Sequence, residues 1–365
     1  MKIFLCGDVM TGRGIDQILH HPVQPHLYEG YVKDARDYVK LAEVVSGKIP
    51  REVAADYIWG DALTIWKERR PDLKIINLET AITTNETFFN KGINYRMHPD
   101  NISVFTAAGI DICSLANNHI LDWDRTGMRE TISVLDRINI KHSGAGETIK
   151  EAAAPAIFEN EEGRVLVFSI GHISSGVPIE WSATDRKSGV FLLTVFNDES
   201  IQKIQRLIEQ YKKQEDIVIV SIHWDSNWGY DVPDSNSKFA HDLIDLAGVN
   251  IIHGHSSHHP RPIEIYKGCP IFYGCGDFIN DYEGIGGHEE FRPDLSLMYF
   301  IDIQMKPFKL QKLELDCLKI NHFRLNQASF KDTNWMQENL TKVCKEFSLK
   351  FCRSEENVIK VNLFL

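Results

Sequence analysis

The stretch IDICSLANNHILDWDRTG, residues 110–127, joins a short apolar run to a polar cluster and the start of a helix-like segment. Residues 110–115 are mostly apolar and of strand length, and Asn117, Asn118 and His119 follow almost at once. The amphipathic segment Thr126–Arg137 comes next. A strand that ends in polar groups before a helix is the unit from which α/β proteins with parallel sheets are built.

The same alternation recurs along the chain. Other strand candidates are KIFLCG (2–7), LKIINL (73–78), VLVFSI (165–170), DIVIVSI (216–222), VNIIHG (249–254) and PIFYGC (270–275). Helix-like segments are 56–70, 126–137, 200–213 and 237–247. Because the strands are apolar throughout, they predict a mainly parallel sheet buried between helices, in an α/β protein with one continuous core.

The pattern changes after about residue 262. Hairpin-like strands at 262–267, 270–275, 296–305 and 309–319 indicate a second sheet that is mixed or antiparallel. We predict one main domain over residues 1–320, in which 22–50 form a loop-rich insertion. Residues 321–365 form a small extension packed on the core, with a helix at about 333–347 and a final strand, VIKVNLFL.

Composition narrows the function classes. The net charge of −11 argues against nucleic-acid binding but permits an anionic substrate, because a bound metal can reverse the local field. The seven cysteines are scattered and form no CxxC pair, which favours a reducing compartment. No stretch approaches the roughly 20 apolar residues of a membrane span, and the N-terminal run is too short for a signal peptide. We therefore expect a soluble, cytoplasmic protein, with peripheral membrane association left open.

Polar residues at the strand ends are the informative feature. Asp8 follows the first strand, Glu79 the second, and Asn118 the third, while His223 and His255 end two later strands. The carboxyl ends of parallel strands meet at one edge of a sheet, where ligands bind. Carboxylate, amide and imidazole groups together favour Mn, Zn, Fe or Co, with Mg also a candidate. The sequence therefore predicts a site for one or two divalent ions.

The place of each residue at this edge of the sheet suggests its role. The predicted metal ligands are Asp8, Glu79, Asn118, His223, His255 and His258, with Glu79 as the bridging carboxylate between two ions. His119 is the predicted general acid, and Asp122 either orients it or caps the next helix. Substrate-binding candidates are Arg13, Arg96, Arg186 and Asn117. The simpler alternatives are helix caps for the acids and satisfied core positions for the histidines.

Six stretches, GDVMTGR, INLET, ICSLANNHILDWDRTG, SIHWDSNWGY, IIHGHSSHHPRPIEIY and IFYGCGDFIND, resemble the CapA family of bacterial capsule and poly-γ-glutamate synthesis proteins. That family is itself similar to the calcineurin-like metallophosphoesterases. The resemblance covers residues 2 to about 281 and implies a four-layer α/β/β/α sandwich. It also implies a role in polyglutamate production, with membrane-associated synthesis proteins as partners.

Two departures from the metallophosphoesterase pattern bear on the metal site. Met10 stands where that superfamily usually has a histidine, and the GHSSH stretch (254–258) is one residue longer than its usual Gly-His-x-His. Methionine is a poor ligand for hard metals, so we expect either that one of two metal positions is weak or that only one metal binds. Two functions follow as hypotheses: a metal-dependent hydrolase or transferase acting on a phosphoester or poly-γ-glutamate, and a non-catalytic polymer-assembly subunit that keeps the fold.

Overall fold

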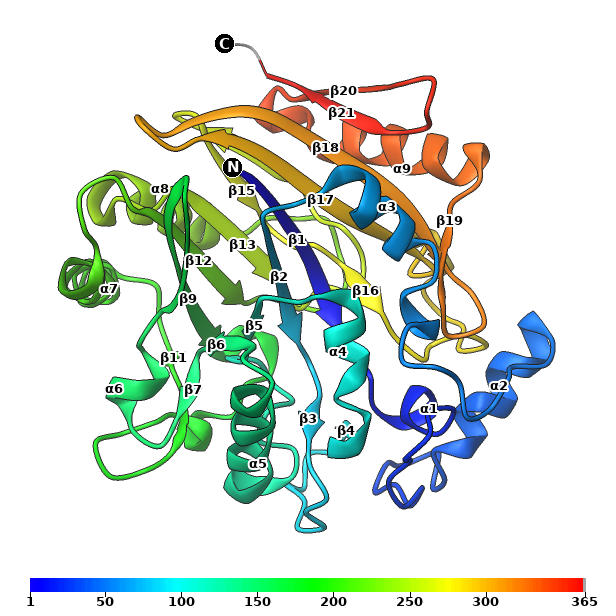
Figure 1. The fold of residues 1–365 in the computed structure, drawn as a ribbon. Helices are drawn as coiled ribbons and strands as arrows, with labels where there is room; N and C mark the ends of the chain where they lie inside the picture. The colour runs from blue at the N-terminus through cyan, green and yellow to red at the C-terminus, as the bar shows by residue number, and fades with distance from the viewer. Residues whose placement is uncertain (364–365) are drawn as a thin grey trace.

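The computed structural model describes residues 1–363 and contains two large mixed β-sheets (Figure 1). The first sheet has the order β20-β21-β18-β17-β1-β2-β5-β6, with β16 beside β1 and β19 beside β18. Its central strands β1, β2, β5 and β6 are parallel, and β17, β18, β20 and β21 are antiparallel to their neighbours. The strand bounds are Lys2–Val9 (β1), Leu73–Leu78 (β2), Ile112–Ser114 (β5), Lys141–Ser143 (β6), Asp277–Ile279 (β16), Leu295–Gln304 (β17), Lys309–Ile320 (β18), Leu325–Gln327 (β19), Lys350–Arg353 (β20) and Ile359–Asn362 (β21).

The second sheet has the order β11-β9-β12-β13-β15-β14, with β8 paired to β9. Strands β11, β9, β12, β13 and β15 are parallel, whereas β8 and β14 form antiparallel edges. The bounds are Ala156–Asn160 (β8), Gly163–His172 (β9), Leu192–Leu193 (β11), Ile217–His223 (β12), Ile251–His255 (β13), Ile263–Tyr266 (β14) and Cys269–Phe272 (β15). Short pairs join β3 (Ala81–Ile82) to β4 (Arg96–Met97) and β7 (Ala145–Gly146) to β10 (Gly189–Val190).

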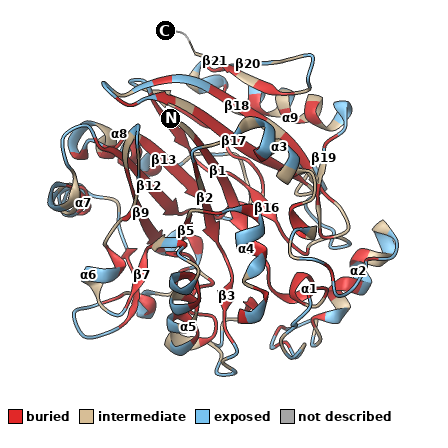
Figure 2. Cartoon of the chain, viewed as in Figure 1, coloured by how far each residue is buried: buried red, intermediate tan, exposed pale blue. Residues whose placement is uncertain are grey.

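The side-chain alternation of the strands explains how the sheets are buried. On β1, Ile3 and Leu5 join an apolar cluster shared with the second sheet, while Phe4 points into a separate cluster with helices. On β12, Ile217 and Ile219 join the shared cluster, and Val218 faces the helix side. Alternate residues of a strand point to opposite faces, so both faces of these strands are buried. Figure 2 shows the central strands as almost continuously buried.

The helices supply the outer apolar clusters. Residues of α3, α4 and α5 pack with the first sheet, and residues of α7 and α8 pack with the second. The helix bounds are Arg13–Asp16 (α1), Arg36–Ser46 (α2), Ala62–Arg69 (α3), Ser103–Ala108 (α4), Asp124–Arg137 (α5), Ile149–Ala152 (α6), Asp198–Tyr211 (α7), Asp234–Ala247 (α8) and Phe330–Val343 (α9). Within residues 1–363, no helix combines the length and the apolar character needed to cross a membrane.

The predicted α/β class is confirmed, but the predicted division into sheets is wrong. The parallel strands expected in one sheet separate into two sheets, with β1, β2 and β5 in the first and β9, β12, β13 and β15 in the second. The late hairpin strands build no sheet of their own, since β14 joins the second and β17 and β18 join the first. Apolar periodicity identifies a strand but does not identify its neighbours, which explains the difference.

The insertion and the C-terminal extension contain more regular structure than their sequences indicate. Residues 22–50, predicted to be loop-rich, include the helix α2. The extension adds β19, β20 and β21 to the edge of the first sheet beside α9, so it continues the sheet as well as packing on it. The predicted final strand ends at Asn362 in the structure, and its last two residues, 364–365, lie outside the described part of the chain.

A β-bulge near the end of β1 sets the geometry of the molecule's centre. The pairing with β2 passes from Leu5–Ile75 to Asp8–Asn77, so Cys6 and Gly7 together lie opposite one residue. A Cβ atom on Gly7 would lie 1.6 Å from the Gly276 carbonyl oxygen. The Asp8 amide donates to that same oxygen at 2.9 Å. Only glycine at position 7 allows the segment before β16 to approach β1 this closely.

We predict that Gly7→Ala destabilises the protein by at least about 3 kcal/mol, because the close backbone contact gives the added methyl group no room. The control is Gly30→Ala, since a Cβ atom there meets nothing within 4 Å. That change is expected to stay within about 0.5 kcal/mol of the parent. Thermal and denaturant unfolding with chelator present measure both variants, and equal stability of the two would contradict this role of the bulge.

Candidate metal centre

The predicted ligands converge where strands of both sheets end. Asp8 lies near the end of β1, opposite Asn77 of β2 and Asp277 of β16 in the strand registers, and Glu79 directly follows β2. In the second sheet, His223 at the end of β12 is paired in register with His255 at the end of β13. The centre is therefore built from both sheets at once.

Three buried carboxylates form the acidic part of the centre. Asp8, Glu79 and Asp277 have carboxylate oxygens that all lie within 4.8 Å of one another. Burial, reinforced by Asp277, raises the pKa of Asp8 to about 7. Burial and the neighbouring Asp8 raise the pKa of Glu79 well above its usual range. Like charges this close in a buried site are unfavourable unless a cation is present between them.

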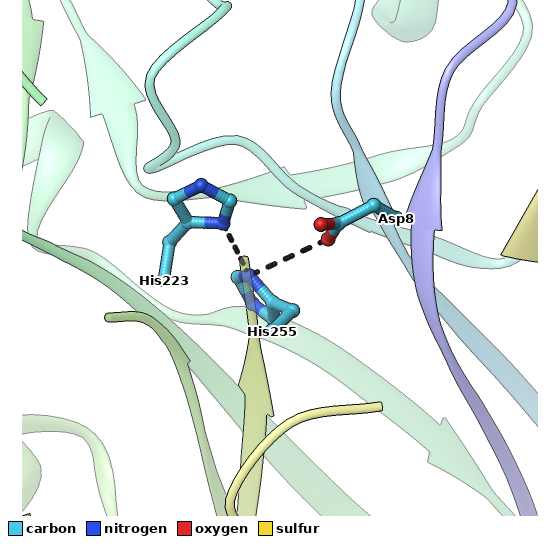
Figure 3. A group of neighbouring side chains, drawn as sticks. All are labelled: Asp8, His223 and His255. Carbon is cyan, nitrogen blue, oxygen red and sulfur yellow. Dashed lines mark hydrogen bonds and ion pairs between the residues drawn. The ribbon is translucent and has the colours of Figure 1, made fainter. Parts of the chain in front are cut away.

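A second group places two histidines against the same Asp8 carboxylate (Figure 3). His255 Nδ1 lies 2.8 Å from His223 Nδ1 and 4.0 Å from Asp8 Oδ1. Burial lowers the pKa of both imidazoles well below the usual value, so they are neutral at pH 7. Neutral imidazole is the form that coordinates a metal. Asp8 belongs to both groups, whereas Glu79, the predicted bridging carboxylate, belongs to the acidic group.

The surroundings of His223 fit a divalent cation. Its Nε2 atom lies 3.2 Å from the Asn118 amide oxygen and 3.7 Å from Glu79 Oε1. In the tautomer without hydrogen on Nε2, this nitrogen faces oxygens that only accept hydrogen bonds, and the lone pairs are directed at one another. A cation would satisfy all of them, and nitrogen with oxygen donors is the set that Mn, Zn and Fe prefer.

Asp277 is a candidate ligand that the sequence did not single out as one. It follows β15 in the segment GCGDF, and the sequence analysis did not include it among the predicted ligands. In the structure its carboxylate accepts from His258 Nδ1 at 3.0 Å and belongs to the acidic group. Burial lowers the pKa of His258, but Asp277 and Asp8 outweigh it and raise the value. The signal available was a further aspartate immediately after a buried strand.

His119 and Asp122 form a buried pair beside the ligands. His119 Nδ1 lies 2.6 Å from Asp122 Oδ2, and its Nε2 lies 3.8 Å from Glu79 Oε1, toward the carboxylates. The His119 ring stacks on Tyr95 with centroids 3.9 Å apart. Lys91, which the sequence analysis did not identify, reaches this pair, with its Nζ 2.9 Å from Asp122 Oδ1. Burial raises the pKa of Asp122 to about 7, although Lys91 opposes this.

The predicted substrate-binding residues occupy different settings. Arg13 is buried and paired with Glu29 at 3.0 Å and with Asp281 at 2.5 Å. Arg96 stacks on Trp123 and donates to the Asn85 carbonyl. The Arg13 guanidinium is therefore engaged in this conformation, whereas the buried Nε atom of Arg96 has no hydrogen-bond partner.

The other two substrate-binding candidates differ in their distance from the centre. The Asn117 side chain donates to the Leu78 carbonyl and accepts from the His119 amide, so it shapes the loop that carries His119. Arg186 is exposed in the turn between Thr184 and Lys187, and the structure does not bring it to the ligand cluster.

The chain matches a known protein family and several known proteins. Residues 2–282 match the family described as "Bacterial capsule synthesis protein PGA_cap". A probable polyglutamine synthesis accessory protein of Mycobacterium tuberculosis is 43% identical over 369 residues, covering 99% of this chain and 96% of that protein.

Two Bacillus proteins match more distantly. The capsule biosynthesis protein CapA of Bacillus anthracis is 24% identical and spans 77% of this chain and 60% of its own length. The PGA biosynthesis protein CapA of Bacillus subtilis is 28% identical and spans 75% and 62%. All of the candidate ligands lie inside the matched family region. With a family match over most of its length and a relative similar from end to end, the chain belongs to the CapA family of bacterial capsule synthesis proteins.

Proposed function

We propose that the protein is a metal-dependent hydrolase or transferase of an anionic substrate, either a phosphoester or poly-γ-glutamate, in capsule or polyglutamate biosynthesis. The observation that carries this proposal is the sharing of Asp8 between a carboxylate group and an imidazole group at the ends of strands from both sheets. The names of the relatives, which refer to polyglutamine and capsule synthesis, support the same area of metabolism. Membrane-associated synthesis proteins are the partners we propose for such an accessory role.

The two groups divide the ligands between two positions for divalent ions. Asp8, Glu79 and Asp277, with His258 beside them, would hold one ion, and Asp8, His223, His255 and Asn118 the other. Asp277 would supply a further anionic oxygen beside Asp8, in a chain whose Met10 offers only a thioether where the superfamily usually has a histidine. Bound divalent ions polarise a phosphoryl or carbonyl oxygen and promote attack by water near pH 7. The two sheets with helices outside them also support a four-layer sandwich of the metallophosphoesterase type.

The residues around this centre supply the proton chemistry. His119 is held by Asp122 through Nδ1 and directs Nε2 toward the carboxylates, which is the arrangement of a general acid beside a reacting bond. The stacked Tyr95 ring restricts rotation of the imidazole. Lys91 balances the Asp122 charge within the same buried pair. His119 would therefore pass a proton to the leaving oxygen or nitrogen without acting as a metal ligand. Burial and the Lys91 charge lower the pKa of His119 well below its usual value, so the imidazole would hold this proton only briefly.

The second hypothesis, a non-catalytic assembly subunit, keeps one specific observation in its favour. Arg13 is buried and already paired with Glu29 and Asp281, so its guanidinium is not free for an anionic substrate. A subunit of this kind would still bind divalent ions, because the ligands are present. Turnover, rather than metal content, separates the two functions.

We predict that the protein with Mn²⁺ hydrolyses an activated phosphodiester or a γ-glutamyl oligomer, and that His119→Ala lowers kcat by about 10²–10⁴-fold. Calorimetry is expected to give the same Mn²⁺ affinity for this variant as for the parent, because His119 is no ligand in the proposal. His142→Ala, at a half-buried histidine on β6, is the control and should leave both quantities unchanged. No turnover of either substrate class with Mn²⁺, Zn²⁺ or Mg²⁺ would favour the assembly subunit.

Asp277→Asn should weaken Mn²⁺ binding by at least about 10-fold, since it removes an anionic oxygen from one metal position and the partner of His258. Isothermal calorimetry measures this directly. The control Asp111→Asn removes a partly buried carboxylate that accepts from the Lys74 amide at the opposite end of β5. An unchanged Mn²⁺ affinity in Asp277→Asn would show that Asp277 is not a metal ligand.

A further inference from the structure

A chain of buried hydrogen bonds runs behind the metal centre and connects the two sheets. Ser221 Oγ on β12 lies 2.8 Å from His255 Nε2, 3.1 Å from His253 Nδ1 and 2.7 Å from Ser114 Oγ on β5. His253 Nε2 lies 2.6 Å from the carbonyl oxygen of Cys6 on β1. The four side chains are fully buried, so the protein alone determines the direction of each hydrogen bond.

The contact between His253 and the Cys6 carbonyl fixes the direction of the hydrogen bonds in this chain. A carbonyl oxygen can only accept, so the 2.6 Å contact requires the proton of His253 on Nε2. His253 is fully buried, and its two ring nitrogens contact a serine hydroxyl and a backbone carbonyl rather than a carboxylate, so a charged ring there would be unfavourable and the ring is neutral. A neutral imidazole carries a single N–H, and His253 Nδ1 is therefore a bare acceptor facing Ser221. The β1 bulge, which takes Cys6 and Gly7 out of the regular pairing with β2, is the feature that presents this carbonyl.

Ser221 extends the same direction of hydrogen bonding from His253 to His255. Its hydroxyl has one hydrogen, which goes to the bare Nδ1 of His253. Its oxygen then accepts from Ser114 and from His255 Nε2. The opposite arrangement, with Ser221 donating to His255, would leave the His253 nitrogen and the Ser221 oxygen as two fully buried acceptors in contact, which is unfavourable. The arrangement inferred here leaves its one unmatched contact between His223 Nε2 and the half-buried Asn118, where water or a metal ion can satisfy both atoms.

We infer that Ser221 is a positioning residue, which with His253 holds His255 in the tautomer that has hydrogen on Nε2 and a bare Nδ1 facing the metal centre. The metal-binding part of this inference rests on the proposed function, whereas the tautomer is a property of the protein alone. Without metal, the bare Nδ1 accepts from His223 Nδ1, the contact drawn in Figure 3. That leaves His223 Nε2 bare toward Asn118 and Glu79. Both ring nitrogens needed by the metal are thus kept free of hydrogen.

The tautomer is measured on the intact protein after treatment with chelator. Long-range ¹H–¹⁵N spectra of protein labelled with ¹⁵N-histidine distinguish protonated from bare ring nitrogens, and the His255→Gln and His253→Gln variants assign the two rings. The inference requires hydrogen on Nε2 of both His255 and His253. Hydrogen on Nδ1 of either ring overturns it, whether or not the protein binds metal.

The positioning role is measured by Mn²⁺ calorimetry. Ser221→Ala is expected to weaken Mn²⁺ binding by about 10–100-fold, the usual effect of losing an outer partner of a histidine ligand. Ser114→Ala is the matched control, because Ser114 only donates to Ser221 and its loss leaves the direction of the chain intact. His253→Leu provides a second variant, since it frees the Ser221 hydrogen to donate to His255 and should also weaken binding.

Equal affinities of Ser221→Ala, His253→Leu and Ser114→Ala would overturn the positioning role while leaving the metal centre in place. If the parent protein binds no Mn²⁺, the proposed function fails and the positioning role fails with it. The spectra then still decide the tautomer. The two failures are therefore distinguishable.

Discussion

Three carboxylates buried within 4.8 Å of one another are the constraint on which the rest of the structure depends. Asp8, Glu79 and Asp277 are each at most 4% exposed, so water does little to screen their repulsion. Without a cation, such a cluster must take up protons, which is why burial raises the pKa of Asp8 to about 7. A divalent ion would relieve the repulsion and supply reactivity at the same place. Under the proposed function, the unfavourable burial of these carboxylates is offset when a divalent ion binds.

The two sheets meet through this centre. The carboxylates and Asn118 come from the strands of the first sheet or the loops that follow them, and His223 and His255 come from the second. The bulge in β1 serves both sides, because Gly7 admits the chain before β16 and Cys6 presents its carbonyl to His253. Apolar packing between the sheets holds these elements in place. A bound metal would therefore join the sheets at their carboxyl ends, where apolar packing gives way to polar groups.

The sequence predicted the polar residues at the strand ends better than it predicted which strands pair in each sheet. Asp8, Glu79, Asn118, His223 and His255 could be identified because each follows a strongly apolar run, and such runs are local signals. Asp277 was not predicted as a ligand because its importance comes from its pairing with β1, 269 positions away along the chain. The contact of Lys91 with Asp122 and the hydrogen bonds of Ser221 likewise depend on segments that are far apart in the sequence. The division into two sheets was missed for this reason too, since periodicity is a property of one strand and pairing is a property of two.

Anomalous diffraction from crystals soaked in Mn²⁺, recorded on both sides of the manganese absorption edge, tests the centre most directly. We expect two manganese peaks about 3.5–4 Å apart that share Asp8. One would lie against Glu79 and Asp277, and the other against His223 and His255. A single peak on the histidine side would remove the carboxylate position. Manganese bound only elsewhere, or no anomalous peak at Asp8, would contradict the account.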